Sequence, residues 1–524
     1  MSNPLPPIPI PPKVPAQPGR SGHGREIRGE MLPRRSDFFE GRFGRLFRTL
    51  PPAKHDIAML AKLADKMAAE AEAEETPDTE QDAEENNHIP AGYTYLGQFI
   101  DHDLTFDPNS SLQKQNDLEA LVDFRTPRFD LDCVYGRGPA DQPYMYREDG
   151  TMFLFGRQLT GSTFDKNTRD LPRNNPDPLG TNRTNARALI GDPRNDENVI
   201  VSQLQGIFMR FHNHVAAEMI RRNRLVEFKD IQQSVRWHYQ WVILHDFLPR
   251  IVDIEVLKSI LPGFIRHKPF TDCFKPNLQI FKWRNSAFIP IEFTAAAYRF
   301  GHSMIRPIYR LNSTLPNRFH IFSSDPLDSL VGFREFPDVW AIDWRLYFPI
   351  EKRPILGPDR VQPAYKIDTS IVNPLKTLPN PVVPPKPEVE RNLAYRNLVR
   401  GFQMSLPSGQ AIARQLCIKP LTEAQLVVGK ATGDPEDEQI PLVSIDPAFE
   451  DNAPLWYYIL AEAQVHREDT KLRGVGARIV AEVFVGLLFG DSHSFLAQNQ
   501  TWSPPEGPGF DMPALIRQAL LAKD

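Results

Sequence analysis

The chain has 524 residues and a formal net charge of -5 at pH 7. This length allows one large domain or several smaller ones, and the slight acidity provides no basic field for nucleic acid or an anionic membrane surface. No apolar run approaches the roughly 20 residues of a membrane span. We therefore expect a protein with no nucleic-acid partner and no membrane span, whose oligomeric state the sequence leaves open.

The first segment, residues 1–30, is rich in proline and glycine and begins MSNPLPPIPIPPKVPAQPGR. Such a composition predicts a disordered tail. It contains neither the basic nor the apolar region of a secretory signal, and the three cysteines are too far apart to indicate a disulfide framework. A cytoplasmic location is the default expectation, and leaderless secretion is the alternative.

Helical periodicity follows the tail over residues 56–75 and then gives way to an acidic stretch that ends EENNH. We expect residues 69–90 to form a solvated acidic insertion within one domain that spans residues 31–524.

Further along the chain, several segments have the periodicity of amphipathic helices, and alternating strand patterns are scarce. Between residues 307 and 387 prolines are frequent and apolar runs are short, which indicates loops. The sequence therefore predicts a mainly α, large single-domain fold with long loops and little β structure. The helical segments cover residues 199–223, 231–252, 293–304, 388–401, 456–466 and 476–488.

The segment GQFIDHDLTF, residues 97–106, places a histidine between two aspartates in apolar surroundings. On a helix, Gln98, Asp101 and His102 share one side, while Asp103 points roughly perpendicular to His102. Burying such groups costs several kcal/mol unless each finds a partner. One helix could thus serve two different ligands, although a polar patch at a capped helix end is the alternative.

Three later segments carry further polar residues in apolar helical contexts. YRFGHSMIRP contains His302, with Arg299 three residues before it, and a neutral imidazole is a common axial ligand of haem iron. LIGDPRNDENVIV places Arg194 at the start of a long helix, and LAYRNLVRGFQMSLPSG presents Asn397 and Arg400 on one face. Taken separately, each of these residues could also be structural.

Together the four segments resemble those of the animal-type haem peroxidases of the peroxidase–cyclooxygenase superfamily. A fifth segment, QWVILHDFLPRIV, is similar to a structural helix of that fold. The order and approximate spacing agree from Tyr93 to Gly409, about three-fifths of the chain. The chain is thereby identified as a bacterial-like, leaderless member with a mainly α haem peroxidase fold.

This resemblance implies that haem b lies between two histidines. His302 would be the proximal iron ligand, with Asn397 accepting the proton of its other ring nitrogen. His102 would transfer a proton of hydrogen peroxide, Arg194 would stabilise the charge on the departing oxygen, and Gln98 would orient water, peroxide or halide. A ferryl intermediate would then be reduced by small electron donors, for which halides, thiocyanate and phenols are open alternatives.

The family often links haem to protein through ester bonds from one aspartate and one glutamate. Asp101 and Glu197 occupy the matching positions, so the resemblance allows both esters. A sulfonium link in one family member requires a methionine after that glutamate, and because Asn198 stands there we predict none. Arg299 and Arg400 would lie near the haem propionates or the pocket edge.

In the family, the aspartate after the distal histidine binds calcium together with a downstream loop, which TPRFDLDCVYG resembles. Calcium requires six to eight oxygen ligands. Asp132 departs from the usual serine but adds a carboxylate, and a simple turn at this loop is the alternative. The implied ligands are Asp103, Thr126, Asp130, Asp132 and the backbone carbonyl of Arg128.

Three other functions are weighed against this one. A fatty-acid dioxygenase of the same superfamily would need a tyrosine where Arg299 stands, and Tyr298 is one residue too far back. A zinc hydrolase would use His214 and Glu218 at helical spacing with His212 nearby. An inactive interaction protein with a proline-rich tail is the third alternative.

Overall fold

The computed structural model describes residues 41–522, apart from 72–75, 107–121, 124, 175–185, 223–225, 283–286, 381, 384–385 and 468–469. The predicted proline-rich tail, residues 1–30, lies outside the described residues.

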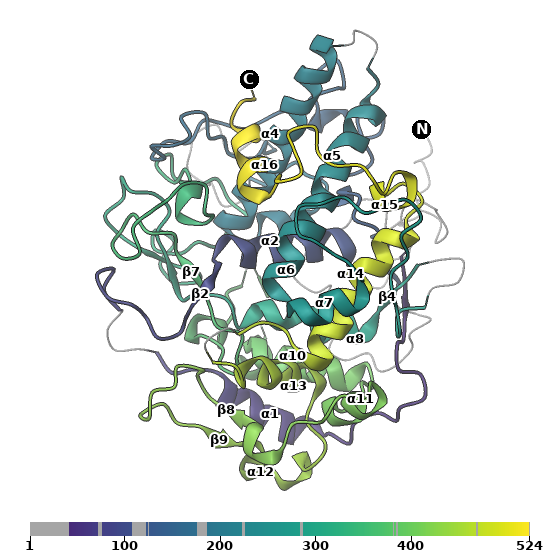
Figure 1. Ribbon diagram of the computed structural model, residues 1–524. Coiled ribbons are helices and arrows are strands. Elements are labelled where there is room, and N and C mark those ends of the chain that lie inside the picture. Colours follow the sequence, from purple (N-terminus) through teal and green to yellow (C-terminus); the bar gives the residue numbers. More distant parts are fainter. Residues whose placement is uncertain are drawn as a thin grey trace, which may run out of the picture.

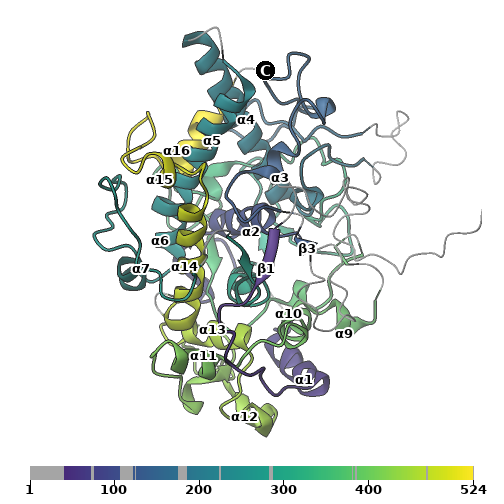
Figure 2. The same ribbon diagram turned by 90° about the vertical axis from the view of Figure 1, so that its right-hand side faces the viewer.

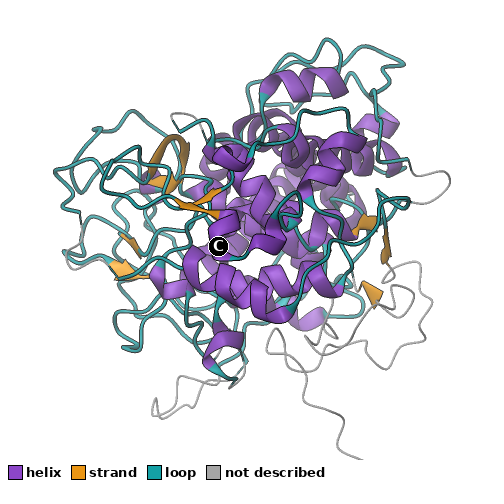
Figure 3. Ribbon diagram, turned by 90° about the horizontal axis from the view of Figure 1, so that it is seen from below, coloured by secondary structure: helices purple, strands orange, loops and turns teal. Residues whose placement is uncertain are grey.

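Helices dominate the described chain, as the sequence predicts, and strands are short and peripheral (Figure 3). The first half of the chain contains α1 (Ile57–Met67), α2 (Gly92–Leu104), α3 (Asp132–Tyr135), α4 (Val199–Arg222), α5 (Phe228–Val242), α6 (Leu248–Ile251) and α7 (Ile254–Ile260). The second half contains α8 (Ile291–Thr294), α9 (Glu388–Arg391), α10 (Leu393–Gln403), α11 (Gly409–Gln415), α12 (Leu442–Ile445), α13 (Leu455–Gln464), α14 (Gly474–Gly490), α15 (Phe495–Gln498) and α16 (Met512–Ala519).

Helix α2 crosses the centre of the molecule, with α4 and α5 on one side and α8, α10 and α13 on the other (Figure 1 and Figure 2). The rings of Phe99 in α2 and Phe208 in α4 stack with centroids 4.4 Å apart. Aromatic contacts of this kind add to the apolar area that each helix buries. α2 is therefore held in the core, where its polar residues must find partners.

The strands form small sheets at the periphery. β1 (Gly41–Gly44) lies between β3 (Val122–Asp123), which is antiparallel to it, and β4 (Ile289–Pro290), which is parallel to it. The remaining pairs are antiparallel: β2 (Glu85–Pro90) with β7 (Pro363–Tyr365), β5 (Ile308–Tyr309) with β6 (Phe319–His320), and β8 (Val427–Val428) with β9 (Ile440–Pro441).

Most predicted helices are present, with two local differences. The segment 231–252 contains a π-helical turn, η5 (Ile243–Phe247), between α5 and α6. The segment 293–304 is not one α-helix but α8 followed by a 3-10 helix, η6 (Ala297–His302). The backbone at Ala296, with φ -141° and ψ -69°, is not helical and separates the two.

The prediction of a solvated acidic insertion over residues 69–90 is wrong for its second half. Glu85 in β2 is only 2 % exposed, because Arg306 and Arg360 donate to its carboxylate. These two arginines lie more than 200 residues further along the chain, where the local sequence gives no sign of the pairing.

Candidate active site

Helix α2 is buried along its length except for one strip. Gly97, Gln98 and Asp101 are partly exposed, whereas the remaining residues of α2 are buried. A helix turns every 3.6 residues, so these three positions share a face. The sequence predicts Gln98, Asp101 and His102 on one side of the helix; Gln98 and Asp101 do lie on this strip, whereas His102 is buried.

His102 lies on α2 and is 4 % exposed. Its Nδ1 atom is 2.7 Å from the side-chain oxygen of Asn195. Asn195 belongs to a 3-10 turn, η4 (Pro193–Asp196), that precedes α4, and it is completely buried. Asn195 directly follows Arg194 in the chain but was not among the predicted site residues.

Arg194 is anchored at the end of α2. Its guanidinium donates to the backbone carbonyls of His102 and Thr105 and to the carboxylate of Asp192. It also lies over the ring of Phe106, 4.4 Å from the centroid. The side chain of Arg194, the predicted catalytic arginine, thus binds the backbone of His102, the predicted catalytic histidine.

Asp192 serves two guanidinium groups at once. Arg125 donates to it at 2.5 Å and Arg194 at 2.8 Å. Burial opposes ionisation, but the two arginines hold the pKa of Asp192 well below its ordinary value. The carboxylate therefore stays charged and fixes the position of both arginines.

Gln98 connects the exposed strip to the turn before α4. It donates to Glu197 at 2.9 Å and accepts from Asn198 at 3.1 Å. Burial raises the pKa of Glu197 to about 7, against the opposing effects of Arg194 and of the hydrogen bond from Gln98. Near neutral pH, Glu197 is therefore present in both its protonated and its ionised form.

Asp101 occupies the same strip as Gln98. Burial raises its pKa, while Arg194 and Arg299 oppose the rise and the Thr105 hydroxyl donates to its carboxylate at 3.2 Å. Since Arg194 belongs to the distal turn and Arg299 to η6, Asp101 lies between the two predicted halves of the site.

His302 ends η6 and is partly exposed. Its Nδ1 atom is 2.8 Å from the amide nitrogen of Asn397, on the buried face of α10. The amide oxygen of Asn397 accepts from Arg299 at 3.2 Å. The predicted contact is present, but the amide is turned so that its nitrogen, not its oxygen, faces the histidine.

Direct contacts join η6 to α2. The hydroxyl of Tyr298 donates to the backbone carbonyl of Gly97 at 3.3 Å. Tyr298 also stacks on Phe293, with ring centroids 4.8 Å apart. The segments that carry His102 and His302 therefore lie side by side, although they are 200 residues apart in the sequence.

Several arginines gather around η6. Burial lowers the pKa of Arg299 to about 10; Asp101 opposes this change, whereas Arg400, Arg396 and Arg194 reinforce it. Arg396 was not among the predicted residues, because a single arginine on a helix is usually a surface residue. This group of cations is suited to bind carboxylates.

The residues around His302 fit a haem group in two respects. Apart from the two residues adjacent in the chain and the backbone of the same helix, no atom of the described residues lies within 4 Å of the position that a Cβ of Gly301 would occupy, so there is open space beside the histidine. The nearby guanidiniums of Arg299 and Arg400 match the two propionates of haem in chemistry. An imidazole for the iron, open space for the ring and cations for the propionates together fit a haem group.

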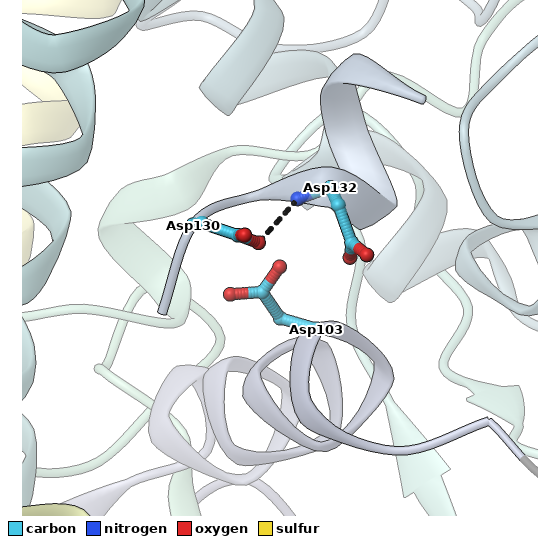
Figure 4. Close-up of side chains that lie close together, drawn as sticks. All are labelled: Asp103, Asp130 and Asp132. Carbon is cyan, nitrogen blue, oxygen red and sulfur yellow. Dashed lines mark hydrogen bonds between the residues drawn. The ribbon is translucent and has the colours of Figure 1, made fainter. Parts of the chain in front are cut away.

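A cluster of three aspartates lies on the other side of α2 (Figure 4). Carboxylate oxygens of Asp103, Asp130 and Asp132 come within 4.8 Å of one another. Both oxygens of Asp103 and both of Asp132 are buried, and within the described residues none of them makes a hydrogen bond of ordinary geometry, although the guanidinium of Arg125 lies 3.5 Å from Asp132. Burial, reinforced by Asp130, raises the pKa of Asp103 to about 7. Such a cluster is stabilised when a cation binds.

Other predicted ligands border this cluster. Thr126 donates to Asp130 at 2.8 Å, and the backbone N–H of Arg128 donates to the carbonyl of Thr126. Arg125 lies 3.5 Å from Asp132 and also donates to the carbonyl of His102 at 3.2 Å. The aspartate cluster and the distal histidine are thus connected through one guanidinium.

The residues proposed for a zinc hydrolase do not assemble into a site. His212 is buried, with its ring nitrogens occupied by Tyr135 and by the carbonyl of Thr151, and burial lowers its pKa to about 4. Glu218 pairs with Arg221 at 2.7 Å. Within the described ranges, the aspartate cluster is the one group of acidic, histidine or cysteine side chains placed to share a metal ion.

Comparisons with known proteins agree with this arrangement. The family model for animal haem peroxidase matches residues 120–425. This match includes Arg194, His302 and Asn397 but begins after α2. The chain belongs to the animal haem peroxidase family.

Relatives of the chain are similar over part of their length. Eosinophil peroxidase of Mus musculus is 26 % identical over 396 residues, which cover 63 % of this chain and 51 % of that protein. Myeloperoxidase of Homo sapiens is 26 % identical over 231 residues, which cover 42 % and 27 % of the two chains. The chain thus spans about half the length of the mouse protein.

Solved structures share the fold. Peroxidase A of Dictyostelium discoideum superimposes with a TM-score of 0.61 at 17 % identity, covering 96 % of this chain and 97 % of that one. A fatty acid α-dioxygenase of Arabidopsis thaliana superimposes with a TM-score of 0.53 at 14 % identity, covering 92 % of this chain and 76 % of that one.

None of the described helices combines the length and apolar character that a membrane crossing requires.

Proposed function

We propose that this protein is a haem peroxidase that reduces hydrogen peroxide to water and oxidises small donors. One observation carries the proposal: His102 and His302 lie on two contacting segments, and an asparagine side chain contacts Nδ1 of each. Bound haem would supply the redox chemistry. Halides, thiocyanate and phenols are the candidate donors, and family membership supports the overall reaction.

His302 would hold the haem iron through Nε2, while Arg299 and Arg400 would pair with the propionates. His102 would take the proton of one peroxide oxygen and return it to the other, which leaves as water. The positive charge of Arg194, fixed close to His102, would favour this charge movement, and Gln98 would orient the incoming peroxide.

Asp101 and Glu197 are proposed to form ester links to haem. Their support is the position of both carboxylates, on the strip of α2 and on the adjoining turn, together with the burial that raises the pKa of each. We also propose that the aspartate cluster binds calcium through Asp103, Asp130 and Asp132, with Thr126 and the carbonyl of Arg128 completing the oxygen ligands. The support for this site is that these buried carboxylates lie within 4.8 Å of one another, with the guanidinium of Arg125 3.5 Å from Asp132.

The test is an absorption spectrum of the purified, haem-supplemented protein before and after hydrogen peroxide is added. We expect a Soret band that shifts with peroxide, loss of haem in His302→Ala, and retained haem with a peroxide reaction slowed roughly 100-fold or more in His102→Leu. A protein that binds no haem after supplementation would refute the proposal. Extraction with acidified organic solvent tests the esters separately, because the double variant Asp101→Asn/Glu197→Gln should release haem that the parent protein retains.

A fatty-acid dioxygenase activity is the second candidate, since solved structures of that class share the fold. Tyr298 stands one residue before the position that this class would require, but it is buried, stacks on Phe293 and donates a hydrogen bond to the carbonyl of Gly97 in α2. Oxygen uptake with a long-chain fatty acid and no added peroxide, abolished in Tyr298→Phe, would favour this activity over the peroxidase.

A further inference from the structure

Asn195 connects the distal histidine to the long helix α4. Its side-chain oxygen is 2.7 Å from Nδ1 of His102, and its amide nitrogen donates to the side-chain oxygen of Gln205 at 2.9 Å. All three side chains are buried. We propose that Asn195 is a positioning residue that fixes the proton of His102 on Nδ1 and thereby makes Nε2 the proton-accepting atom of the site. The catalytic meaning of this assignment rests on the proposed function.

The direction of the chain of hydrogen bonds determines the tautomer. An amide presents an acceptor oxygen on one side and a donor nitrogen on the other. Because the nitrogen of Asn195 is directed to Gln205, its oxygen faces the histidine ring, and Nδ1 must carry the hydrogen. In a neutral imidazole the other nitrogen is then unprotonated, and it can act as a base.

Three secondary-structure elements hold this chain in place. His102 comes from α2, Asn195 from η4 and Gln205 from α4. The turn is fixed by a bond from the backbone N–H of Asn195 to the carbonyl of Asp192 at 3.1 Å. The stacking of Phe99 on Phe208 holds α2 against α4. A side chain held from three directions has little freedom to turn, as a positioning role requires.

The neutral character of Asn195 also matters. A carboxylate in this position would stabilise the charged imidazolium, so that on acidification the ring would already be protonated, and unable to accept a proton from peroxide, at a higher pH. Of the neighbouring carboxylates, Asp196 accepts from Arg173 at 2.7 Å and from Ser202, while Asp192 accepts from Arg125 and Arg194 and also interacts electrostatically with His102. The side chain of this turn that faces Nδ1 is therefore uncharged.

The tautomer can be measured without turnover. In protein labelled with ¹⁵N-histidine, the ring signals of His102 are identified by their loss in His102→Gln. We expect a protonated Nδ1 and an unprotonated Nε2 in the parent protein, and a mixture of tautomers in Asn195→Leu, which has a similar shape but no acceptor. A parent protein with the proton on Nε2, or a variant with an unchanged tautomer, would overturn the assignment.

Stopped-flow mixing of the haem-loaded protein with hydrogen peroxide provides the second readout. Asn195→Leu should lower the second-order rate constant by roughly 10- to 100-fold, the usual cost of losing such a supporting bond. Asn195→Asp keeps an acceptor, so it should retain the rate at alkaline pH and lose it at a higher pH than the parent as the solution is acidified. An unchanged rate in the first variant or an unchanged pH profile in the second contradicts the proposal.

Asn213→Leu is the matched control, since Asn213 is also a buried asparagine of this region but bonds to the backbone of Phe153. It should alter stability without altering the tautomer or the pH profile. The two readouts also separate the claims: a fixed Nδ1 proton without any peroxide reaction would refute the proposed function but not the role of Asn195 in selecting the tautomer.

Discussion

Asn397 lies between His302 and Arg299, with its amide nitrogen 2.8 Å from Nδ1 of the histidine and its oxygen 3.2 Å from the guanidinium. A guanidinium can only donate hydrogen bonds, so it determines which way the amide faces. Nδ1 of His302 is therefore an acceptor here, and the ring proton lies on Nε2. That is the atom proposed to bind iron.

We predict that haem binding reverses this amide. With His302 holding haem through Nε2, its ring hydrogen would lie on Nδ1, and the oxygen of Asn397 would accept that hydrogen once Arg299 pairs with a propionate. Arg299→Met should weaken haem binding roughly 10-fold, the loss of one charge-assisted hydrogen bond. Arg391→Met, an arginine of α9 that donates to the carbonyl of Leu378, should leave haem affinity unchanged.

Resonance Raman spectra of the ferrous protein test the reversal itself. The iron–histidine stretching frequency should fall in Asn397→Leu, because the ring loses the acceptor that increases its basicity, and it should stay at the parent value in Arg299→Met. If the frequency in Asn397→Leu equals that of the parent protein, the amide of Asn397 in the parent does not reverse when haem binds.

Calcium binding is predicted to stabilise the protein through the aspartate cluster. A free ion at about 100 times its dissociation constant adds roughly 2.7 kcal/mol to the free energy of unfolding. Thermal unfolding with calcium and with a chelator should therefore differ in midpoint. Asp103→Asn and Asp132→Asn should remove most of this difference, whereas Asp141→Asn, at an exposed position, should preserve it. Equal stabilisation of Asp103→Asn and the parent would exclude this site.

Asp192 is predicted to be a major contributor to stability. It is completely buried and holds Arg125 and Arg194, so Asp192→Asn leaves two buried cations without their shared counter-charge. Removing one partner of such a pair costs about 3–5 kcal/mol. Asp338→Asn breaks the pair with Arg157 at a side chain that is 68 % exposed, and it should cost less than about 1 kcal/mol. Urea unfolding of both variants measures the difference, and similar losses would contradict the prediction.

The sequence predicts helices well where apolar periodicity is uninterrupted, as in α4 and α14. It fails at η6, because the break at Ala296 depends on packing around the site and not on any local breaker residue. It also fails at Glu85, whose neutralising arginines come from distant segments. Local patterns carry no information about such pairings.

The candidate site was predictable to a similar degree. The resemblance placed Asp103, Asp130 and Asp132 together, and the structure brings their carboxylates within one cluster. The contact of Asn195 with His102 joins residues 93 positions apart, and no spacing rule connects them. The anchoring of Arg194 by Asp192 was missed for a different reason: side-chain direction within a turn depends on the neighbours that the fold provides.

Glu462 gives a prediction for the pH dependence of stability. Glu462 lies in the last turn of α13. Its carboxylate accepts hydrogen bonds from the backbone N–H groups of Val475 and Gly476, at 3.0 and 3.1 Å, in the first turn of α14. These donors favour the charged form, but burial has the larger effect and raises the pKa to about 8. The folded protein therefore retains a proton that the unfolded chain releases near pH 4.5.

The stabilising contribution of this proton is complete below about pH 4.5 and is lost as the pH rises toward 8. The free energy of unfolding should thus fall between pH 5 and pH 8, by up to about 4 kcal/mol from this group. Glu462→Gln keeps the neutral form at every pH, so it should match the parent at pH 5 and exceed it at pH 8. Glu450→Gln, at an exposed position, should follow the parent. Urea unfolding at both pH values, at equal haem content, decides the matter, and a parallel fall in Glu462→Gln would assign the pH dependence to other groups.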